Sequence, residues 1–241
     1  SPIEAVLTWC NCPSLNEVAR SLDLPVIHNE LGPLRTPLYR DTVYFDFEGV
    51  NGNTSASRWN DTAWLREQMR GAVLIECDAL RGMLVKDVAR VERLPEHHER
   101  FAVGVALQVQ DDSNCIAFNR GWDELHLIYD AISRHPVDQV LVRPHPHARF
   151  VYRGGLGTVD ASEDSLAFLA CLDRLVAINS SLLAEAALWG IPFTAKGDTP
   201  ATCLAEGSAG GTAAADDRTL LLNAFFLAYL VPGEALFDPD Y

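Results

Sequence analysis

Segments with the pattern of a buried β-strand alternate with amphipathic helical segments along most of this chain. After residue 99 the strand patterns lie at 100–110, 138–146, 174–179 and 191–196, and the helical patterns between them at 121–135, 162–172 and 181–190. A strand, a helix and a second strand in this order place the two strands parallel in one sheet. The chain is therefore predicted to have an α/β fold with doubly wound parallel sheets and helices on both faces.

The beginning of the chain has the same order but fewer strands, so its lobe is predicted to be reduced or truncated. We expect two α/β lobes, an N-terminal lobe over residues 1–120 and a C-terminal lobe over residues 121–205. Residues 206–241 begin as a loop rich in Gly and Ala and continue into "TLLLNAFFLAYL". This apolar run predicts a buried C-terminal helix that packs back on the first lobe.

The charge balance limits the partners of the chain. Lys and Arg number 19 against 33 Asp and Glu, which gives a formal net charge of −14, and no basic run is present. Such a surface repels nucleic acid and anionic lipid, so neither is expected as a direct partner. No apolar run reaches the roughly 18 residues that cross a bilayer. These features predict no membrane insertion and a cytoplasmic location, with peripheral association with the inner membrane only through other domains or partners.

No metal site is expected. The six cysteines lie mostly in apolar segments and predict free thiols. Cys10 and Cys12 form one C-x-C without a second pair, and the adjacent His97 and His98 fit an exposed polar loop. "DPD" at 238–240 resembles a D-x-D metal motif, but a solvated tail explains it better.

Two adjacent carboxylates, Asp111 and Asp112, end the strand pattern of "VALQVQDDSN". They have two interpretations. Asp, Ser and Asn favour solvated turns. Open α/β sheets also place ligands at the carboxyl ends of their strands, where a carboxylate could act on a substrate.

The next two strand patterns also end in polar groups. "VLVRPHPH" places Arg143 and His145 after one strand, and "AINSSLLAE" places Ser180 and Ser181 at the start of a helix, with Glu185 one turn further on. Hydroxyl groups and free N–H groups at a helix N-terminus bind phosphate. A Pro-rich exit loop and ordinary N-capping are the alternatives for these motifs. Together they predict a nucleotide-phosphate site at one sheet edge, where Glu185 could reach a ribose.

In the first lobe, Glu30 follows the strand "PVIH" directly, and Gly32 and Pro33 turn the chain after it. Its carboxylate is therefore expected at a sheet edge. Asp46 and Glu48 alternate with aromatic residues and are expected to be structural.

These motifs together resemble the retaining β-Kdo glycosyltransferases of bacterial capsule and O-antigen assembly. The matching pieces are "HNELGPLR", "YFDFEGVNG", "LQVQDDSN", "RPHPH" and "INSSLLAEAALWGIPF". These enzymes transfer Kdo (3-deoxy-D-manno-oct-2-ulosonic acid) from CMP-Kdo. The resemblance implies a GT-B fold of two Rossmann-like lobes, with the acceptor on the side of the N-terminal lobe and the CMP-sugar bound mainly by the C-terminal lobe. It also implies no cofactor or metal, and a glycan acceptor that can be lipid-linked. Fusion to, or a complex with, other glycosyltransferases is compatible with it.

The resemblance also implies roles for individual residues. Asp112 takes the position of the nucleophilic aspartate, and Asp111 the variable position before it. His145 and the pair Ser180 and Ser181 take the positions that bind the CMP phosphate, and Glu30 that of the glutamate in "NELGP". We expect Asp112 to form a covalent Kdo adduct and Glu30 to act as the base on the acceptor hydroxyl.

Two alternative functions remain open at the level of sequence. "RPHP" and "SS" are shared more loosely with bacterial sialyltransferases, so another CMP-activated ulosonic acid could be the donor. The reduced first lobe is also compatible with a non-catalytic module that binds CMP or a sugar. Competition between CMP-Kdo and CMP-Neu5Ac, and CMP binding without turnover, separate these alternatives.

Overall fold

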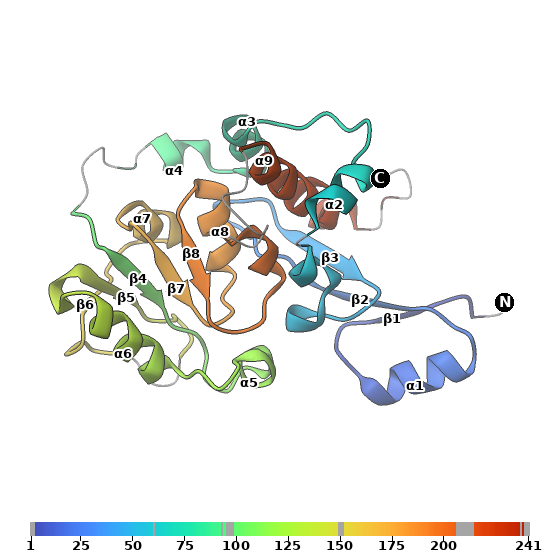
Figure 1. The fold of residues 1–241 in the computed structure, drawn as a ribbon, viewed down its shortest axis with the longest axis horizontal. Coiled ribbons are helices and arrows are strands. Elements are labelled where there is room, and N and C mark those ends of the chain that lie inside the picture. Colours follow the sequence, from blue (N-terminus) through green and yellow to red (C-terminus); the bar gives the residue numbers. More distant parts are fainter. Residues whose placement is uncertain are drawn as a thin grey trace.

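The computed structural model describes residues 3–59, 61–92, 94, 99–148, 152–205, 215–236 and 238. Two β-sheets lie side by side, and helices surround them (Figure 1). In the described part of the chain, none of the helices combines the length and the apolar character needed to cross a bilayer. The α/β class predicted from the sequence is confirmed.

The five-stranded sheet is parallel throughout and has the order β6-β5-β4-β7-β8. Its strands are β4 (Val103–Ala106), β5 (Val140–Arg143), β6 (Thr158–Val159), β7 (Leu175–Ala177) and β8 (Phe193–Ala195). The central strands are buried along their whole length, as expected of a parallel sheet covered on both faces. Their carboxyl ends therefore meet at one edge.

Helices cover both faces of this sheet, as the alternating patterns predict. On one face, α6 (Glu124–Arg134) packs Leu127 and Ile128 against Val103 and Val105 of β4. On the other face lie α7 (Ser165–Ala170) and α8 (Leu182–Trp189), which pack against Ala106, Leu141, Leu175 and Ala177. Successive residues of each strand thus face different helices, because side chains alternate across a strand.

The four-stranded sheet differs from the prediction because it is mixed. Its strands, in the order β1-β2-β3-β9, are β1 (Val6–Thr8), β2 (Val26–Leu31), β3 (Thr42–Asp46) and β9 (Leu230–Pro232). Only β1 and β2, joined through α1 (Pro13–Ser21), are parallel, whereas β3 runs antiparallel to both β2 and β9. Residues 32–41 connect β2 to β3 without a helix, and so short a connection cannot bring a strand back in parallel.

The strand β4 lies within residues 1–120, which the sequence assigns to the first lobe, yet it is the central strand of the second sheet. The chain thus passes between sheets before Val103, through a helical connection. That connection contains α2 (Thr62–Gln68), α3 (Cys77–Leu84) and α4 (Val88–Glu92), and a further helix, α5 (Ser113–Phe118), follows β4. Short 3-10 turns lie at Asn51–Asn53, Ser55–Arg58, Val137–Gln139, Pro200–Leu204 and Gly233–Ala235.

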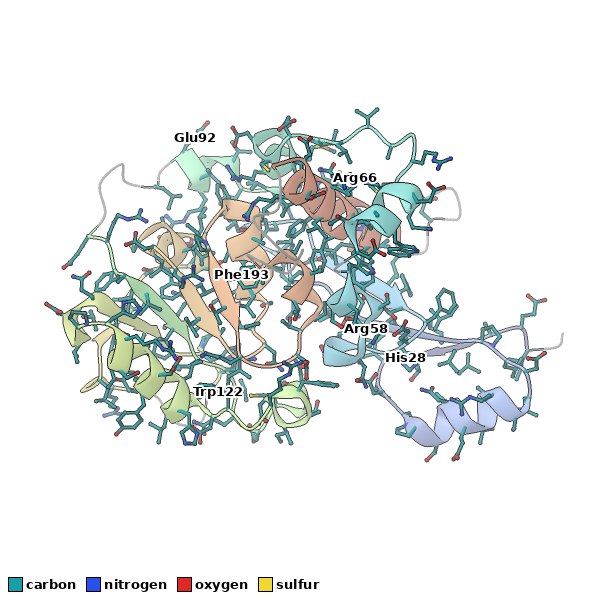
Figure 2. The ribbon with its side chains drawn as sticks, in the orientation of Figure 1. His28, Arg58, Arg66, Glu92, Trp122 and Phe193 are labelled. Atoms are coloured by element: carbon teal, nitrogen blue, oxygen red, sulfur yellow. The ribbon has the colours of Figure 1, made fainter. Side chains whose placement is uncertain are left out.

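The C-terminal segment returns to the first sheet, as predicted. The helix α9 (Ala215–Asn223) continues as a π-helix over Ala224–Tyr229 and leads into β9, a strand that the sequence patterns do not predict. Figure 1 shows α9 beside α2 and α3, which it contacts. Side chains are dense around Phe193 in β8 and sparse around β1 and α1, near His28 (Figure 2).

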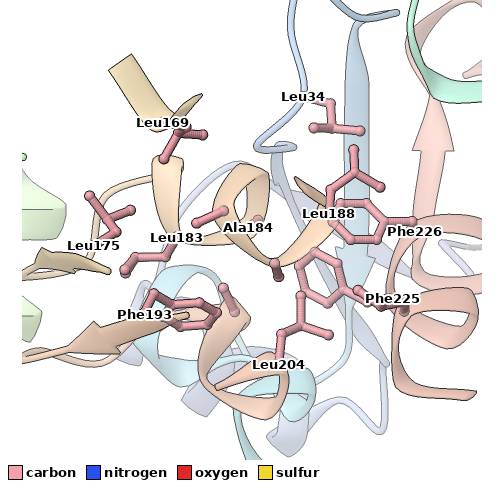
Figure 3. Packing of buried hydrophobic residues seen from close by; sticks show 14 of the residues in the cluster. Leu34, Leu169, Leu175, Leu183, Ala184, Leu188, Phe193, Leu204, Phe225 and Phe226 are labelled. Carbon is pink, nitrogen blue, oxygen red and sulfur yellow. The ribbon is translucent and has the colours of Figure 1, made fainter. Parts of the chain in front are cut away.

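One hydrophobic core joins the two sheets. Figure 3 shows α8 at its centre, with Leu183 toward Phe193 of the second sheet and Leu188 toward Phe226 of the C-terminal helix. Leu34, from the loop after β2, belongs to the same buried cluster. Because protein cores are close-packed, this core holds the facing loops of the two sheets in a defined arrangement.

Candidate active site

The site is built around the loop that joins β7 to α8. Asn179 follows β7 and is 5% exposed, and Ser180 and Ser181 precede the first turn of α8. The Ser180 hydroxyl accepts a hydrogen bond from the backbone N–H of Leu182 at 3.3 Å. The free N–H groups of a helix N-terminus favour anions, so this loop provides donors for a phosphate.

A pair of side-chain amides ties this loop to the end of β4. The Gln108 Nε2 donates to Asn179 Oδ1 at 2.7 Å, and the Asn179 backbone N–H donates to Gln108 Oε1 at 3.0 Å. The Asn179 amide also donates to the backbone carbonyl and the side-chain oxygen of Asn114, at 3.1 and 3.2 Å. These bonds set the position of the loop that carries Asp112. Neither Gln108 nor Asn179 was predicted to be a site residue, although they lie within the motifs "LQVQDDSN" and "INSSLLAEAALWGIPF".

Asp112 is the N-cap of α5. Its carboxylate accepts hydrogen bonds from the backbone N–H groups of Asn114 and Cys115, at 2.8 and 3.4 Å. Asp112 also lines the pocket described below, whereas its neighbour Asp111 lies outside that lining. The turn interpretation and the site interpretation of this aspartate are therefore compatible, since one carboxylate both caps the helix and faces the pocket.

Glu30 reaches the same pocket from the first sheet. It lies on β2 opposite Tyr44 of β3, and its Oε1 accepts a hydrogen bond from the backbone N–H of Leu31 at 2.8 Å. Asp46, by contrast, is 3% exposed and accepts hydrogen bonds from Ser55 and from the Tyr229 hydroxyl. The burial and hydrogen bonds of Asp46 agree with the expectation that it is structural. Glu48, of which the same was expected, is exposed and pairs with Arg58.

A pocket of about 330 Å³ lies between the two sheets. The predicted residues that line it are Glu30, Asp112, Ser180 and Ser181. The structure thus brings together one carboxylate from the first sheet with a carboxylate and two hydroxyls from the second. Arg35, from the loop after β2, and Thr199, from the loop after β8, also line it, and neither was predicted from the sequence.

His145 lies in the loop after β5, outside the lining of this pocket. Its Nδ1 accepts a hydrogen bond from the backbone N–H of His147 at 3.1 Å, which favours the tautomer with a proton on Nε2. Desolvation, assisted by the nearby His147, lowers the His145 pKa, and the charge of Asp112 acts in the opposite direction. His145 is therefore neutral at pH 7 and presents one N–H donor.

Arg143 is held by a carboxylate of its own. Its guanidinium pairs with Asp160, whose side chain is 2% exposed, and lies 5.4 Å from the centre of the Phe168 ring. It also lies outside the lining of the 330 Å³ pocket. The structure thus does not place Arg143 with Asp112 and the serine pair.

Glu185 is 7% exposed and lines a second pocket, of about 350 Å³, which adjoins the first at Pro33, Arg35 and Ser181. The Ser165 hydroxyl donates to Glu185 Oε2 at 2.7 Å, and the Tyr39 hydroxyl also hydrogen-bonds to it. Burial raises the Glu185 pKa to about 7, against the opposing effect of these two hydroxyls. A buried carboxyl beside an open pocket is available to a ligand that brings hydroxyl groups.

Within the described residues, no three His, Cys, Asp or Glu side chains come together as a metal site. His97, His98 and most of "DPD" lie outside the described residues. The cysteines are free thiols, as expected.

Residues 1–55 match the glycosyltransferase 99 family N-terminal domain. None of the curated proteins compared with the chain matches it. Two solved structures of KpsC from Thermosulfurimonas dismutans have a similar fold. The β-Kdo 2,7 transferase shares 15% identity at a TM-score of 0.57, over 89% of this chain and 74% of that chain. The β-Kdo 2,4 transferase shares 17% identity at a TM-score of 0.57, over 91% of this chain and 79% of that chain.

At these identities the similarity to KpsC shows the fold, which is the two-lobed GT-B arrangement predicted from the sequence. The family match is a separate similarity, to a glycosyltransferase domain, and it covers only the first 55 residues. Residues 1–55 are thus similar to the N-terminal domain of a glycosyltransferase family, and the chain shares its fold with two β-Kdo transferases.

Proposed function

We propose that the chain is a retaining glycosyltransferase that moves Kdo from CMP-Kdo to a bacterial surface-glycan acceptor. The observation that carries the proposal is the pocket between the sheets, which Glu30, Asp112, Ser180 and Ser181 line together. The two KpsC structures, which are β-Kdo transferases, support the choice of Kdo as the transferred sugar.

In the first step, a carboxylate oxygen of Asp112 attacks C2 of Kdo, and the bond from C2 to the phosphate oxygen of CMP breaks. C2 is a tertiary anomeric carbon, so the departing CMP leaves oxocarbenium character that a carboxylate can capture. The hydroxyls of Ser180 and Ser181 and the N-terminus of α8 stabilise the phosphate that leaves. His145 lies outside the pocket lining but near enough for the charge of Asp112 to act on its pKa, and its Nε2–H can add a further donor. The product of this step is an aspartyl-Kdo ester, inverted at C2.

In the second step, an acceptor hydroxyl attacks C2 from the opposite side. Glu30 takes the proton of that hydroxyl, the bond between C2 and Asp112 breaks, and the carboxylate of Asp112 is restored. The second inversion gives net retention. Glu30 suits this role because it faces the pocket from the first sheet, opposite the donor-binding loops.

The adjoining pocket accommodates the rest of the donor. Ser181 lines both pockets, so a phosphate at Ser181 directs the nucleoside toward Glu185, whose carboxyl can bind ribose hydroxyls. Arg143 contributes positive charge near Glu185 rather than a direct contact, because Asp160 already holds its guanidinium. No metal enters either step. The reaction would take place in the cytoplasm, where CMP-sugars are available, with a capsular or O-antigen glycan as the acceptor.

The covalent intermediate provides the test. Wild-type protein given CMP-Kdo and no acceptor should gain the mass of one Kdo residue on the peptide that contains "QVQDDSN". CMP-Neu5Ac, given in the same way, should leave the peptide unmodified. Transfer without any adduct, or a product inverted at C2, would contradict the double displacement. An adduct formed from CMP-Neu5Ac but not from CMP-Kdo would show that the donor is a CMP-sialic acid.

A further inference from the structure

Arg35 lines both the pocket that holds Glu30 and Asp112 and the pocket that holds Glu185. It lies in the loop between β2 and β3, and its Nε donates to the backbone carbonyl of Gly32 at 3.2 Å. This bond leaves the two terminal nitrogens of the guanidinium for other partners. The Arg35 guanidinium thus lies where the two pockets adjoin, and Ser181 also lines both of them.

Hydrogen bonds and close packing attach the loop that carries Arg35 to β3. The Gly32 backbone N–H donates to the Thr42 carbonyl at 2.7 Å, and the Thr42 hydroxyl donates to the Leu34 carbonyl at 3.0 Å. A side chain at Gly32 would meet the Thr42 Oγ1 at 2.1 Å, so the loop packs directly on β3. Leu34 is buried in the core. The backbone around Arg35 is therefore anchored on β3, while its side chain is exposed to an incoming ligand.

Among the described residues, Arg35 forms no ion pair with a carboxylate. Arg90, the other arginine that lines the second pocket, pairs with both Glu163 and Asp164. The two pockets also contain carboxylates, including Glu30 and Asp112, in a chain whose net charge is −14. An anionic donor can enter such a site only if its charges find cations or N–H donors there.

We infer that Arg35 binds the carboxylate on the anomeric carbon of the transferred sugar and thereby selects ulosonic acid donors. This inference rests on the proposed function. The donor brings two anionic groups, a phosphodiester and a sugar carboxylate, and the α8 N-terminus with its serine pair provides for the first. The guanidinium matches the second, because its planar N–H groups bind a carboxylate in a bidentate manner.

The chemistry of the first step gives a further reason. The carboxylate of an ulosonic acid is attached to the carbon that Asp112 attacks, so two like charges must approach each other as the bond forms. A cation on the sugar carboxylate reduces that repulsion. Arg35 lines the same pocket as Asp112 and can provide it.

The test separates the carboxylate from the phosphate. Affinities for CMP, for CMP-Kdo and for the C1 methyl ester of CMP-Kdo are measured by calorimetry in the Asp112→Asn background, so that no covalent bond forms. Arg35→Gln should lower the affinity for CMP-Kdo by about 10- to 100-fold, the usual effect of losing a charge-assisted hydrogen-bonded pair. It should leave the affinities for CMP and for the methyl ester unchanged. The affinity of Arg35→Lys for CMP-Kdo should lie between those of the protein with Arg35 and of Arg35→Gln. Arg20→Gln, an exposed arginine in an open pocket beside α1, is the control and should change none of the affinities.

An equal loss of affinity for CMP and CMP-Kdo would place Arg35 on the phosphate and overturn the inference, as would unchanged affinity for all three ligands. If wild-type protein neither binds CMP-Kdo nor forms the adduct, the proposed function fails. The same measurements with CMP-Neu5Ac, which also has a carboxylate on its anomeric carbon, then test Arg35 separately. Loss of CMP-Neu5Ac binding in Arg35→Gln would support the inference even in that case, and unchanged binding would refute it.

Discussion

Gln108 and Asn179 are joined by two hydrogen bonds. Gln108 Nε2 donates to Asn179 Oδ1 at 2.7 Å, and the Asn179 backbone N–H donates to Gln108 Oε1 at 3.0 Å. They join the ends of β4 and β7, the two neighbouring strands whose loops carry Asp112 and the serine pair. Asn179 is almost fully buried, so each of its hydrogen bonds replaces contact with water. This amide pair thus positions both the proposed nucleophile, Asp112, and the proposed phosphate site at Ser180 and Ser181.

We predict that Asn179→Ala, which removes the acceptor of Gln108 Nε2 and the two bonds to Asn114 but keeps the backbone bond to Gln108 Oε1, lowers the free energy of unfolding by about 1 to 3 kcal/mol. Affinity for CMP should fall with it, because the Ser180 loop loses its anchor. Urea unfolding of Gln108→Ala, Asn179→Ala and the double variant gives the coupling energy of the pair. Additive effects of the two substitutions would show that the hydrogen bonds do not act together.

Asp112 both caps α5 and lines the pocket, so its two roles must be tested apart. Asn is as good an N-cap as Asp. The free energy of unfolding of Asp112→Asn should therefore lie within about 0.5 kcal/mol of the wild-type value. That of Asp112→Ala should be lower by about 1 kcal/mol, because the helix loses its cap. Both variants should fail to form the Kdo adduct in mass spectrometry. Asp111→Ala is the matched control and should keep it. An adduct in Asp112→Asn would move the nucleophile elsewhere.

Glu30→Gln should separate the two chemical steps. A base is needed only when the acceptor hydroxyl attacks, so the variant should form the aspartyl-Kdo adduct at the wild-type rate. Its transfer to the acceptor should be slower by about 100- to 10,000-fold, the usual contribution of a general base. Rapid-quench kinetics with mass detection follow both steps. Slow adduct formation in Glu30→Gln would assign Glu30 to donor binding instead.

Glu185 should make the stability of the folded chain depend on pH. Its pKa is raised to about 7 by burial, so between pH 4.5 and 7 the folded state holds a proton that the unfolded state has released. The stability that this proton contributes is complete below pH 4.5 and is lost as pH rises through 7. Glu185→Gln removes the titration. The free energy of unfolding of the variant relative to wild type should rise by on the order of 3 kcal/mol from pH 4.5 to 8. A constant difference would show that the carboxyl is ionised in the folded state throughout this range.

Transfer should continue in the presence of a chelator. The proposed phosphate site consists of hydroxyls, N–H groups and an imidazole, none of which requires Mg²⁺. Initial rates with CMP-Kdo and an acceptor, measured with and without EDTA, should agree within about twofold. Loss of activity that Mg²⁺ or Mn²⁺ restores would instead indicate a metal-assisted departure of CMP.

The sequence by itself determined the α/β class, because strand and helix periods are local properties of the chain. Its motifs also selected four of the pocket residues, Glu30, Asp112, Ser180 and Ser181. Asp112 and the two serines follow apolar strands whose carboxyl ends meet at one edge of the parallel sheet. Glu30 lies within β2 of the mixed sheet, and only the packing of the two sheets brings it to the same pocket. Asp46 was recognised as structural from its alternation with aromatic residues.

Only the tertiary structure decided which strands pair and which polar groups meet. The mixed first sheet depends on β9, which comes from the far end of the chain and pairs with β3. Membership of β4 in the second sheet follows from pairing with β5 and β7, which a strand pattern alone does not specify. Arg143 was selected by its motif, yet Asp160 holds it. Gln108, Asn179 and Arg35 were not selected, because a residue acquires such a role through partners that are distant in sequence and near in space.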